Sequence, residues 1–418
     1  MTTLLKNGYI FTESGFVKRD VFVVNDRLSL AHTPSYDECV DCDSCFIIPG
    51  FVDVHVHLRE PGFFYKESIR SGTMAAARGG YTAVCSMPNL NPAPSTMETL
   101  QAQLDIIEKD AAVKVFPYGT ITKAQNGRGV LSDMEDMKEK VIAYSDDGKG
   151  VQTGKLMEAA MRKAKALDRI IVAHCEDESL LHGGYIHDGA YAAAHGHKGI
   201  CSESEWGQVK RDIALCQKTG ARYHVCHIST KETVDLIRQA KKVGIPVTCE
   251  TAPHYLVLCD MDLQEEGRFK MNPPLRAQED RSVLLEGLLD GTIDLIATDH
   301  APHSAEEKSE GLAKSAFGIV GLETAFPVLY THLVKPRKIT LEKLVELMAI
   351  APRGIFGIEG GFIREGQIAD VAVLDVNRHY NIDPAEFLSK GRSTPFAGME
   401  VWGENRMTFV NGKKVWEK

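Results

Sequence analysis

Short apolar runs alternate with longer segments of helical spacing through most of the chain. Eight of these runs have the character of buried parallel strands. They span residues 47–57, 81–88, 113–121, 141–145, 169–174, 222–227, 245–250 and 293–298. Between them lie segments rich in Ala and Leu that suit crossover helices, clearest at residues 69–78, 157–167, 231–243 and 281–289. Eight strands joined by such crossovers predict an α/β protein with a (β/α)₈ barrel of the TIM type.

The two ends of the chain have a different pattern. Residues 1–46 and 362–418 contain short alternating strands punctuated by Gly and Asn, which is typical of hairpins. Neither end is long enough to bury a core alone. We therefore predict that both termini form one small β-sandwich beside a barrel of residues 47–361.

Composition narrows the choice of partners. The chain has 418 residues, of which 44% are hydrophobic and 25% charged, as in an ordinary globular protein. A formal net charge of −9 without a basic run argues against a nucleic-acid partner and favours a small molecule. No apolar stretch reaches the length of a membrane span, and the start lacks the layout of a signal peptide. We expect a cytoplasmic protein that does not enter a membrane, and its ten cysteines are then expected to be reduced.

Candidate chemistry begins at the end of the first predicted strand. His55 and His57 are two residues apart, so they share one face, and Arg59 follows just beyond. Paired imidazoles at this spacing suit Zn²⁺ or a similar cation. The alternative for an isolated His-x-His is a polar pair on a solvated strand.

Other strand ends favour the metal interpretation. Five of the eight predicted strands end in His or Asp, and the carboxyl ends of barrel strands meet at one rim. The candidate residues at the ends of the fourth, fifth, sixth and eighth predicted strands are Asp146, Asp147, His174, His227, Asp299, His300 and His303. Converging carboxylates and imidazoles are costly to desolvate without a cation, so we predict a dinuclear divalent metal centre.

Several neighbours of these residues are expected to lie elsewhere. Cys175 and Cys226 adjoin predicted ligands, and alternation along a strand predicts that both thiols pack outward under helices. His224 should likewise face away from His227. Four histidines in the polar loop after the fifth strand are expected to be solvated: His182, His187, His195 and His197.

A repeated Cys-x-x-Cys spacing links Cys39, Cys42 and Cys45. A fourth ligand is missing, and the segment lies in the predicted sandwich, away from the barrel rim. A structural role is therefore favoured over a metal site, with oxidation-sensitive thiols as the remaining alternative.

Longer motifs then identify a family. The segments 53–62, 270–276, 297–303 with Lys308, and 317–327 resemble class I bacterial dihydroorotases. These enzymes belong to the amidohydrolase superfamily of metal-dependent barrels flanked by a β-sandwich. The likeness covers essentially the whole chain, and the motifs occur in the same order.

The resemblance implies roles for the rim residues. It places His55, His57 and Asp299 on one metal, His174 and His227 on a second, and a bridging carboxylate at Asp147. The implied cofactor is Zn²⁺, one or two per chain, with two expected. Chemistry alone does not separate Asp146 from Asp147, whereas register with the family favours Asp147.

The implied reaction is reversible, zinc-dependent hydrolysis of the cyclic amide of L-dihydroorotate to N-carbamoyl-L-aspartate, the third step of pyrimidine synthesis. Zinc polarises the carbonyl and lowers the pKa of a bound water, so that a metal-bound hydroxide attacks. Asp299 accepts the proton and passes it to the departing ring nitrogen.

The resemblance also implies the substrate contacts. Arg59 suits the substrate carboxylate with its planar fork, and Asn89 and His303 are further donors. Asn272 and the backbone of Phe317 and Gly318 would hold the ring amide, with His57 beside the substrate. Without the resemblance, Asn89 would be taken as a turn residue and Asn272 as a residue restricted by Pro273. His254 stays open between a supporting and a core role, and Asp53 is a candidate partner for an imidazole.

Two rival functions remain at this point. An allantoinase or dihydropyrimidinase would use the same barrel, but its substrate lacks the carboxylate that Arg59 would bind. A non-catalytic scaffold would be expected to have lost metal ligands, and every expected ligand is present here. Class I relatives suggest a homodimer.

Overall fold

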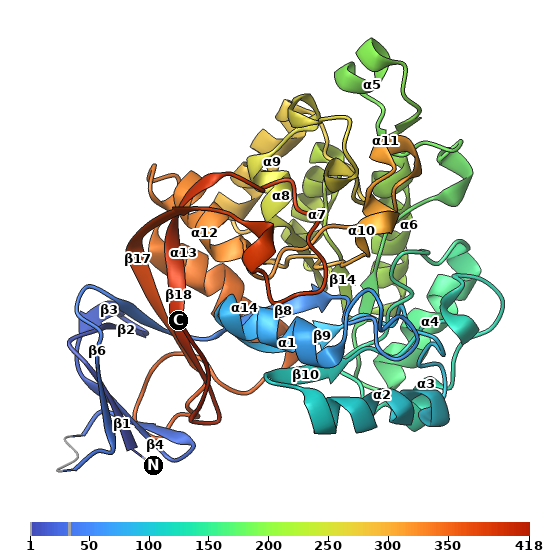
Figure 1. Ribbon diagram of the computed structural model, residues 1–418. Helices are drawn as coiled ribbons and strands as arrows, with labels where there is room; N and C mark the ends of the chain where they lie inside the picture. The colour runs from blue at the N-terminus through green and yellow to red at the C-terminus, as the bar shows by residue number, and fades with distance from the viewer. Residues whose placement is uncertain (1, 32–34) are drawn as a thin grey trace.

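Parallel strands from the middle of the chain form two sheets in the computed structural model, which describes residues 2–31 and 35–418 (Figure 1). The first sheet has the order β10-β9-β8 and the second the order β11-β14-β15-β16. Their strands are β8 (Phe51–Val56), β9 (Tyr81–Ser86), β10 (Lys114–Pro117), β11 (Ile171–Ala173), β14 (Tyr223–Val225), β15 (Val247–Thr251) and β16 (Leu295–Ile296). All pairings within these two sheets are parallel.

Single β-bridges connect the two sheets on both sides. Tyr144 forms parallel bridges with Gly119, just beyond β10, and with Ile171 in β11. On the other side Val56 at the end of β8 forms a parallel bridge with His300, beyond β16. Parallel segments therefore follow one another from β8 through to residue 300 and back to β8.

Two of the predicted strands differ from the structure. The run at 141–145 forms no strand of its own and contributes only the bridges of Tyr144. The run at 47–57 is divided by Gly50, where a side chain would meet Thr82 Cγ2 at 2.1 Å. Before it, β7 (Phe46–Pro49) pairs with strands of the terminal sheets, and β8 begins only after it.

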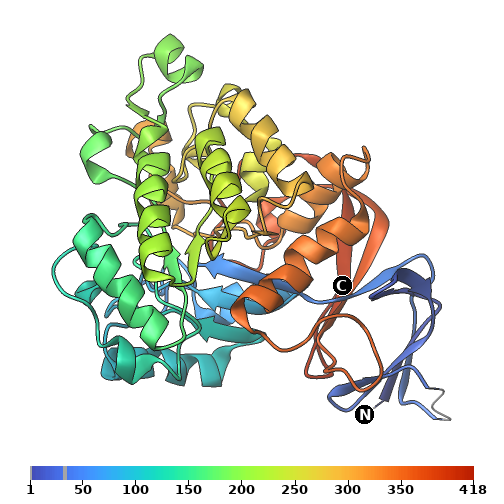
Figure 2. The ribbon, with the colours of Figure 1, turned by 180° about the vertical axis from the view of Figure 1, so that it is seen from behind.

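Helices cover the outer side of the parallel strands, and Figure 2 shows those of residues 154–289 in green and yellow. The longer ones are α1 (Ile69–Arg78), α2 (Met97–Asp110), α4 (Gly154–Ala166), α6 (Glu203–Thr219), α7 (Lys231–Lys242) and α9 (Gln278–Leu289). In α7 the Thr230 hydroxyl accepts from the Thr233 amide at the N-terminus. Val234 and Ile237 form its buried face. The four crossover helices predicted from the sequence are all present.

Shorter helices and a small two-stranded sheet lie in the connections. The helices are α3 (Met134–Met137), α5 (Ala190–His195), α8 (Pro253–Val257), α10 (Ala305–Lys308), α11 (Gly311–Lys314), α12 (Ala325–Leu329), α13 (Leu341–Val345) and α14 (Ala351–Phe356). The two strands are β12 (Ile186–His187) and β13 (Gly199–Ile200). Among the described helices, none is long and apolar enough to cross a membrane.

Strands from the ends of the chain form two further sheets, one of N-terminal strands alone and one of strands from both ends. One has the order β5-β4-β1-β6 and the other the order β19-β18-β17-β7-β2-β3. Their remaining strands are β1 (Thr2–Lys6), β2 (Tyr9–Thr12), β3 (Gly15–Lys18), β4 (Val21–Val24), β5 (Arg27–Ser29), β6 (Glu38–Asp41), β17 (Val371–Asn381), β18 (Glu400–Val410) and β19 (Lys413–Glu417). Leu5 and Val23 from one sheet share a buried cluster with Ile47, Val373 and Phe409 from the other. Strands from the two termini therefore share one buried core.

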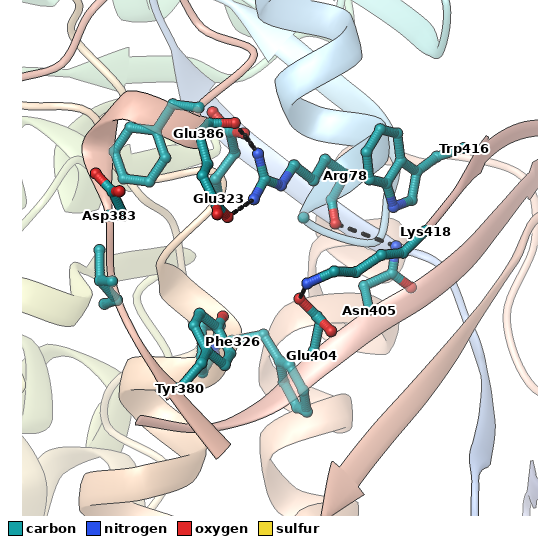
Figure 3. A pocket seen from close by; sticks show the side chains of 14 residues that line it. Arg78, Glu323, Phe326, Tyr380, Asp383, Glu386, Glu404, Asn405, Trp416 and Lys418 are labelled. Carbon is teal, nitrogen blue, oxygen red and sulfur yellow. Dashed lines mark hydrogen bonds and ion pairs between the residues drawn. The ribbon is translucent and has the colours of Figure 1, made fainter. Parts of the chain in front are cut away.

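The long C-terminal strands also contact the helices that flank the parallel strands. A cavity lies at this contact, with Arg78 of α1 between Glu323 and Glu386 (Figure 3). The Arg78 guanidinium lies 3.4 Å from Glu323 Oε1 and 3.5 Å from Glu386 Oε2. Arg78 thereby connects α1 with two segments that follow it by more than two hundred residues.

Candidate metal centre and substrate cavity

The first group of predicted ligands meets at the carboxyl ends of β8 and β16. His57 Nε2 lies 3.1 Å from Asp299 Oδ1, and His55 Nε2 lies 3.5 Å from the same oxygen. Both imidazoles also face Asp147, with His55 Nε2 at 3.3 Å from Oδ1 and His57 Nε2 at 3.5 Å from Oδ2. All four side chains are buried.

The second group lies on the other side of Asp147. His174 Nδ1 and His227 Nε2 are each 3.6 Å from Asp147 Oδ1. These two ring nitrogens are 3.0 Å apart. Asp147 is therefore common to both groups of imidazoles.

The donor set fits divalent cations. Three overlapping groups in the described residues could hold a metal ion: His55, His57 and Asp299; Asp147, His174 and His227; and His55, Asp147 and Cys226. His55 Nε2 and Asp147 Oδ1 are buried and have no hydrogen-bond partner, as is expected of atoms that bind a cation. Although burial opposes ionisation, the neighbouring His55 and His227 hold the pKa of Asp147 well below its usual value. Carboxylate and imidazole donors in this combination suit Zn²⁺ and similar ions.

Asp146 has a different role from its neighbour. Its carboxylate accepts hydrogen bonds from the Ile121 amide at 2.8 Å and the Thr122 amide at 3.0 Å, and from the Thr122 hydroxyl. These bonds occupy the carboxylate, whereas Asp147 Oδ1 has no such partner. The geometry separates two residues that chemistry alone leaves equivalent.

Glu250 supports the centre and was not assigned from the sequence. Its Oε1 lies 2.8 Å from His55 Nδ1, and its Oε2 lies 3.0 Å from His224 Nε2. Burial opposes ionisation, but the hydrogen bonds from His224 and His55 lower the pKa of Glu250 to about 2. A carboxylate on Nδ1 orients His55 so that Nε2 faces the centre. Its position as the last residue of the predicted strand 245–250 was the available signal.

Three expectations about neighbouring side chains are wrong. Cys226 does not pack under a helix with Cys175, because its thiol lies beside His55 and Asp147. His224 does not point away from the centre, since it reaches Glu250. Asp53 accepts from the backbone amides of His55 and Thr298 and not from an imidazole.

The physical reason lies in where the strands end. β14 ends at Val225, so the alternation of faces does not extend to His227, which has a φ of 31°. Cys175 does lie on the other side, with its sulfur 3.2 Å from the Tyr223 hydroxyl.

A cavity of about 210 Å³ opens beside the two groups. It is lined by every predicted substrate residue: His57, Arg59, Asn89, Asn272, His303, Phe317 and Gly318. Arg59 Nε donates to the Pro302 carbonyl at 3.2 Å, and Nη2 lies 3.3 Å from His303 Nε2. Burial, followed by the nearby Arg59 charge, lowers the pKa of His303 to about 3, so this imidazole is neutral.

Two amide side chains present free oxygens in this region. Asn89 Nδ2 donates to the Asp147 carbonyl at 2.8 Å, and Asn272 Nδ2 donates to Glu176 Oε1 at 2.9 Å. The Oδ1 atoms of both are buried without a partner. Glu176, which also lies 3.7 Å from His174 Nε2, is a second supporting residue that the sequence did not assign.

Gly318 requires the absence of a side chain. Its φ is 134°, and a Cβ there would lie 2.7 Å from the Ala301 carbonyl oxygen. The adjacent Phe317 carbonyl is 2.8 Å from His303 Nε2. The loop that carries these residues therefore packs tightly against the segment after β16.

Two histidines and three cysteines that were not assigned to the site from the sequence are placed as follows. His254 is buried, which lowers its pKa to about 4, and Nε2 has no partner. His187 is also buried, contrary to expectation, with Nδ1 at 3.3 Å from Arg276. Cys42 and Cys45 are buried and Cys39 is exposed, and none belongs to a candidate metal group within the described ranges.

The chain is similar to known proteins along its whole length. A model of the Dihydro-orotase-like family matches residues 45–233. A dihydroorotase of Anoxybacillus flavithermus is 48% identical over 100% of this chain and 99% of its own length, and one of Listeria innocua is 49% identical over 99% of each. The chain belongs to the dihydroorotase family. Family membership identifies it as a hydrolase.

Solved structures of other enzymes have a fold similar to that of this dihydroorotase family member, at lower sequence identity. The L-hydantoinase (dihydropyrimidinase) of Arthrobacter aurescens has a TM-score of 0.88 at 26% identity, over 100% of this chain and 96% of that one. The dihydropyrimidinase of Brevibacillus agri has a TM-score of 0.86 at 22% identity, over 100% and 95%. The family member thus shares the amidohydrolase fold.

Proposed function

We propose that this protein is a zinc-dependent dihydroorotase that reversibly hydrolyses the cyclic amide of L-dihydroorotate to N-carbamoyl-L-aspartate. The observation that carries the proposal is the junction of two groups of ligand atoms at Asp147, beside a cavity that contains Arg59. Metal-dependent amide hydrolysis needs the first feature, and an anionic substrate needs the second.

The ligand assignment follows the two groups. His55, His57 and Asp299 would hold one Zn²⁺, His174 and His227 a second, and Asp147 would contact both. When bound, these cations polarise the amide carbonyl and lower the pKa of a water molecule.

The protein's own residues supply the proton transfer. Burial opposes ionisation, but the His57 hydrogen bond together with the nearby imidazoles lowers the pKa of Asp299 to about 2, so its carboxylate is ionised at neutral pH. Asp299 can then accept a proton from water and donate it to the leaving ring nitrogen.

Different residues of the cavity would contact the carboxylate and the ring amide of the substrate. The Arg59 guanidinium would take the carboxylate, with Asn89 and His303 beside it. The free Oδ1 of Asn272 can accept from a ring N–H, and the backbone of Phe317 and Gly318 would contact the other amide edge. A hydantoin or dihydrouracil ring lacks the carboxylate and would leave Arg59 unpaired.

The larger organisation is proposed on the same basis. The bridges at Tyr144 and at Val56 support a closed (β/α)₈ barrel with a β-sandwich of both termini. The expected start of the barrel at residue 47 moves to Phe51, because β7 pairs with strands of the terminal sheets. A homodimer in the cytoplasm, with no nucleic-acid or membrane partner, stays a prediction. Light scattering on the purified protein would test the dimer.

Turnover and metal content, measured on the same samples, test the function. We expect the protein to consume L-dihydroorotate, followed by ultraviolet absorbance, and to contain about two Zn²⁺ per chain. Removal of metal by a chelator should abolish turnover, and added Zn²⁺ should restore it. Asp299→Asn should lose turnover while metal remains bound through the histidines.

Hydantoin and dihydrouracil are the control substrates. Preferred turnover of either one, or full activity in the metal-free protein, would contradict the proposal. Retained activity in Asp299→Asn would contradict only the proton-transfer role.

A further inference from the structure

Lys308 is a buried lysine outside the substrate cavity. It ends α10 and is 8% exposed. Its Nζ donates to the Lys270 carbonyl at 3.0 Å and to the Ala316 carbonyl at 2.7 Å. Among the described residues, no carboxylate oxygen forms an ion pair with this amino group. Its two carbonyl contacts therefore account for its placement.

The two carbonyls belong to the segments that border the substrate cavity. Lys270 precedes Asn272 by two residues, and Ala316 directly precedes Phe317. The Gly318 amide also donates to the Lys270 carbonyl, at 3.1 Å. One carbonyl oxygen thus receives a hydrogen bond from Lys308 and another from the opposite segment.

Lys270 adds a second connection between the same segments. Its Nζ donates to the Ala313 carbonyl at 2.9 Å and lies 4.4 Å from the centre of the Phe317 ring. Lys308 itself does not line the cavity of about 210 Å³. It instead borders a neighbouring cavity of about 410 Å³. Any effect of Lys308 on the substrate is therefore transmitted through the backbone.

We propose that Lys308 is a positioning residue that fixes the Asn272 segment and the Phe317–Gly318 segment at the separation that the substrate ring requires. This inference rests on the proposed function for the identity of the substrate. The position of Lys308 between the two segments does not depend on that function, because it follows from the two carbonyl contacts of its amino group.

A lysine is suited to this position because one nitrogen atom can donate to both carbonyls. Burial, followed by the nearby Lys270 charge, lowers the pKa of Lys308 to about 7. An uncharged amine still carries two N–H groups, one for each carbonyl. Methionine has a similar length and no donor, so the substitution would leave both carbonyls without this partner.

Lys308→Met tests the proposal, with Lys314→Met as the matched control. Lys314 ends the neighbouring short helix α11 and is exposed. We expect kcat/KM for L-dihydroorotate to fall about tenfold or more in Lys308→Met, mainly through a higher KM, because the ring contacts are misplaced. Metal content should stay at the wild-type value. Lys314→Met should match the wild type in both measurements.

Hydrogen exchange supplies a readout that does not depend on the substrate. In Lys308→Met, the amides of Ala316 and Gly318 should exchange faster, because their segment is no longer held against Lys270. If wild-type protein fails to turn over dihydroorotate, the proposed function fails, and the exchange comparison still tests the contact.

Two results would overturn the inference. Unchanged exchange in Lys308→Met would show that the amino group does not hold the segments together. Faster exchange with an unchanged KM would show that their separation does not matter for the substrate. If Lys308→Met does not fold, Lys308→Gln keeps an amide donor for one carbonyl and is judged by the same two measurements.

Discussion

Arg59 illustrates how a single residue can be prepared for an anionic ligand. It has a φ of 62° and is 9% exposed, and its guanidinium contacts a carbonyl and an imidazole. Within the described part of the chain it forms no ion pair with a carboxylate. Burial lowers its pKa, but an arginine stays charged at neutral pH. A nearly buried cation in a cavity, without a carboxylate in direct contact, is available for a substrate carboxylate.

Replacement of this side chain should affect binding more than chemistry. Arg59→Met should weaken the binding of L-dihydroorotate by about 1.5–3 kcal/mol, the usual contribution of a charge-assisted hydrogen bond, and this loss should be seen as a higher KM. Steady-state kinetics would measure this, with Zn²⁺ content as a check on the metal centre. Arg70→Met, an exposed arginine of α1, is the control and should behave as wild type. An unchanged KM in Arg59→Met would remove Arg59 from the substrate site.

At the scale of elements, the site depends on how strands end. The sequence pattern located seven of the eight predicted strands to within a few residues at their ends, because apolar runs and helical spacing are set by burial along each element. Alternation also predicted that His55 and His57 share a face. It failed at the sixth strand, since His227 has a φ of 31° and lies outside β14. Chain direction beyond a strand depends on tertiary contacts, so the faces of Cys226 and His224 could not be inferred by counting back from His227.

Glu176 and Glu250 were missed for a related reason. Each follows or ends a predicted strand, so their positions were visible in the sequence. Their function depends on side chains from other elements, namely Asn272 for Glu176 and His55 for Glu250. Pairings of this kind between distant segments have no signature in a single sequence.

The adjacent pair Asp146 and Asp147 allows a test of the element that contains them. Asp146→Asn should lower the free energy of unfolding by about 1–3 kcal/mol, because the loop after β10 loses hydrogen bonds to a buried carboxylate. Its metal content should stay close to wild type. Asp147→Asn should lose metal and turnover, since Asp147 is shared by both groups of imidazoles. Denaturant titration and metal analysis of both variants would measure these effects, and the opposite assignment of losses would contradict the geometry.

On the scale of the whole molecule, the terminal strands and the flanking helices are joined by charged contacts that no sequence pattern indicated. The net charge of −9 describes the whole chain, whereas the substrate cavity contains Arg59. Near the C-terminal strands, Glu323 accepts from the amides of Leu388 at 2.9 Å and Ser389 at 3.2 Å. Ser389 donates to Glu67, whose Oε2 lies 3.5 Å from His300 Nε2. Polar contacts therefore run from this junction to the residue after Asp299.

Arg78 is the cation of this junction, and its removal should weaken the contact between the two parts of the molecule (Figure 3). The Glu323 side chain is 3% exposed, so Arg78→Met would leave a buried carboxylate with backbone donors alone. We expect the free energy of unfolding to fall by about 1–3 kcal/mol, with a lower transition temperature in calorimetry. Glu386→Gln is the control, because the Glu386 side chain is 64% exposed and an exposed pair contributes about 0–1 kcal/mol. If Arg78→Met is as stable as Glu386→Gln, the junction is held by apolar contacts and not by the Arg78–Glu323 pair.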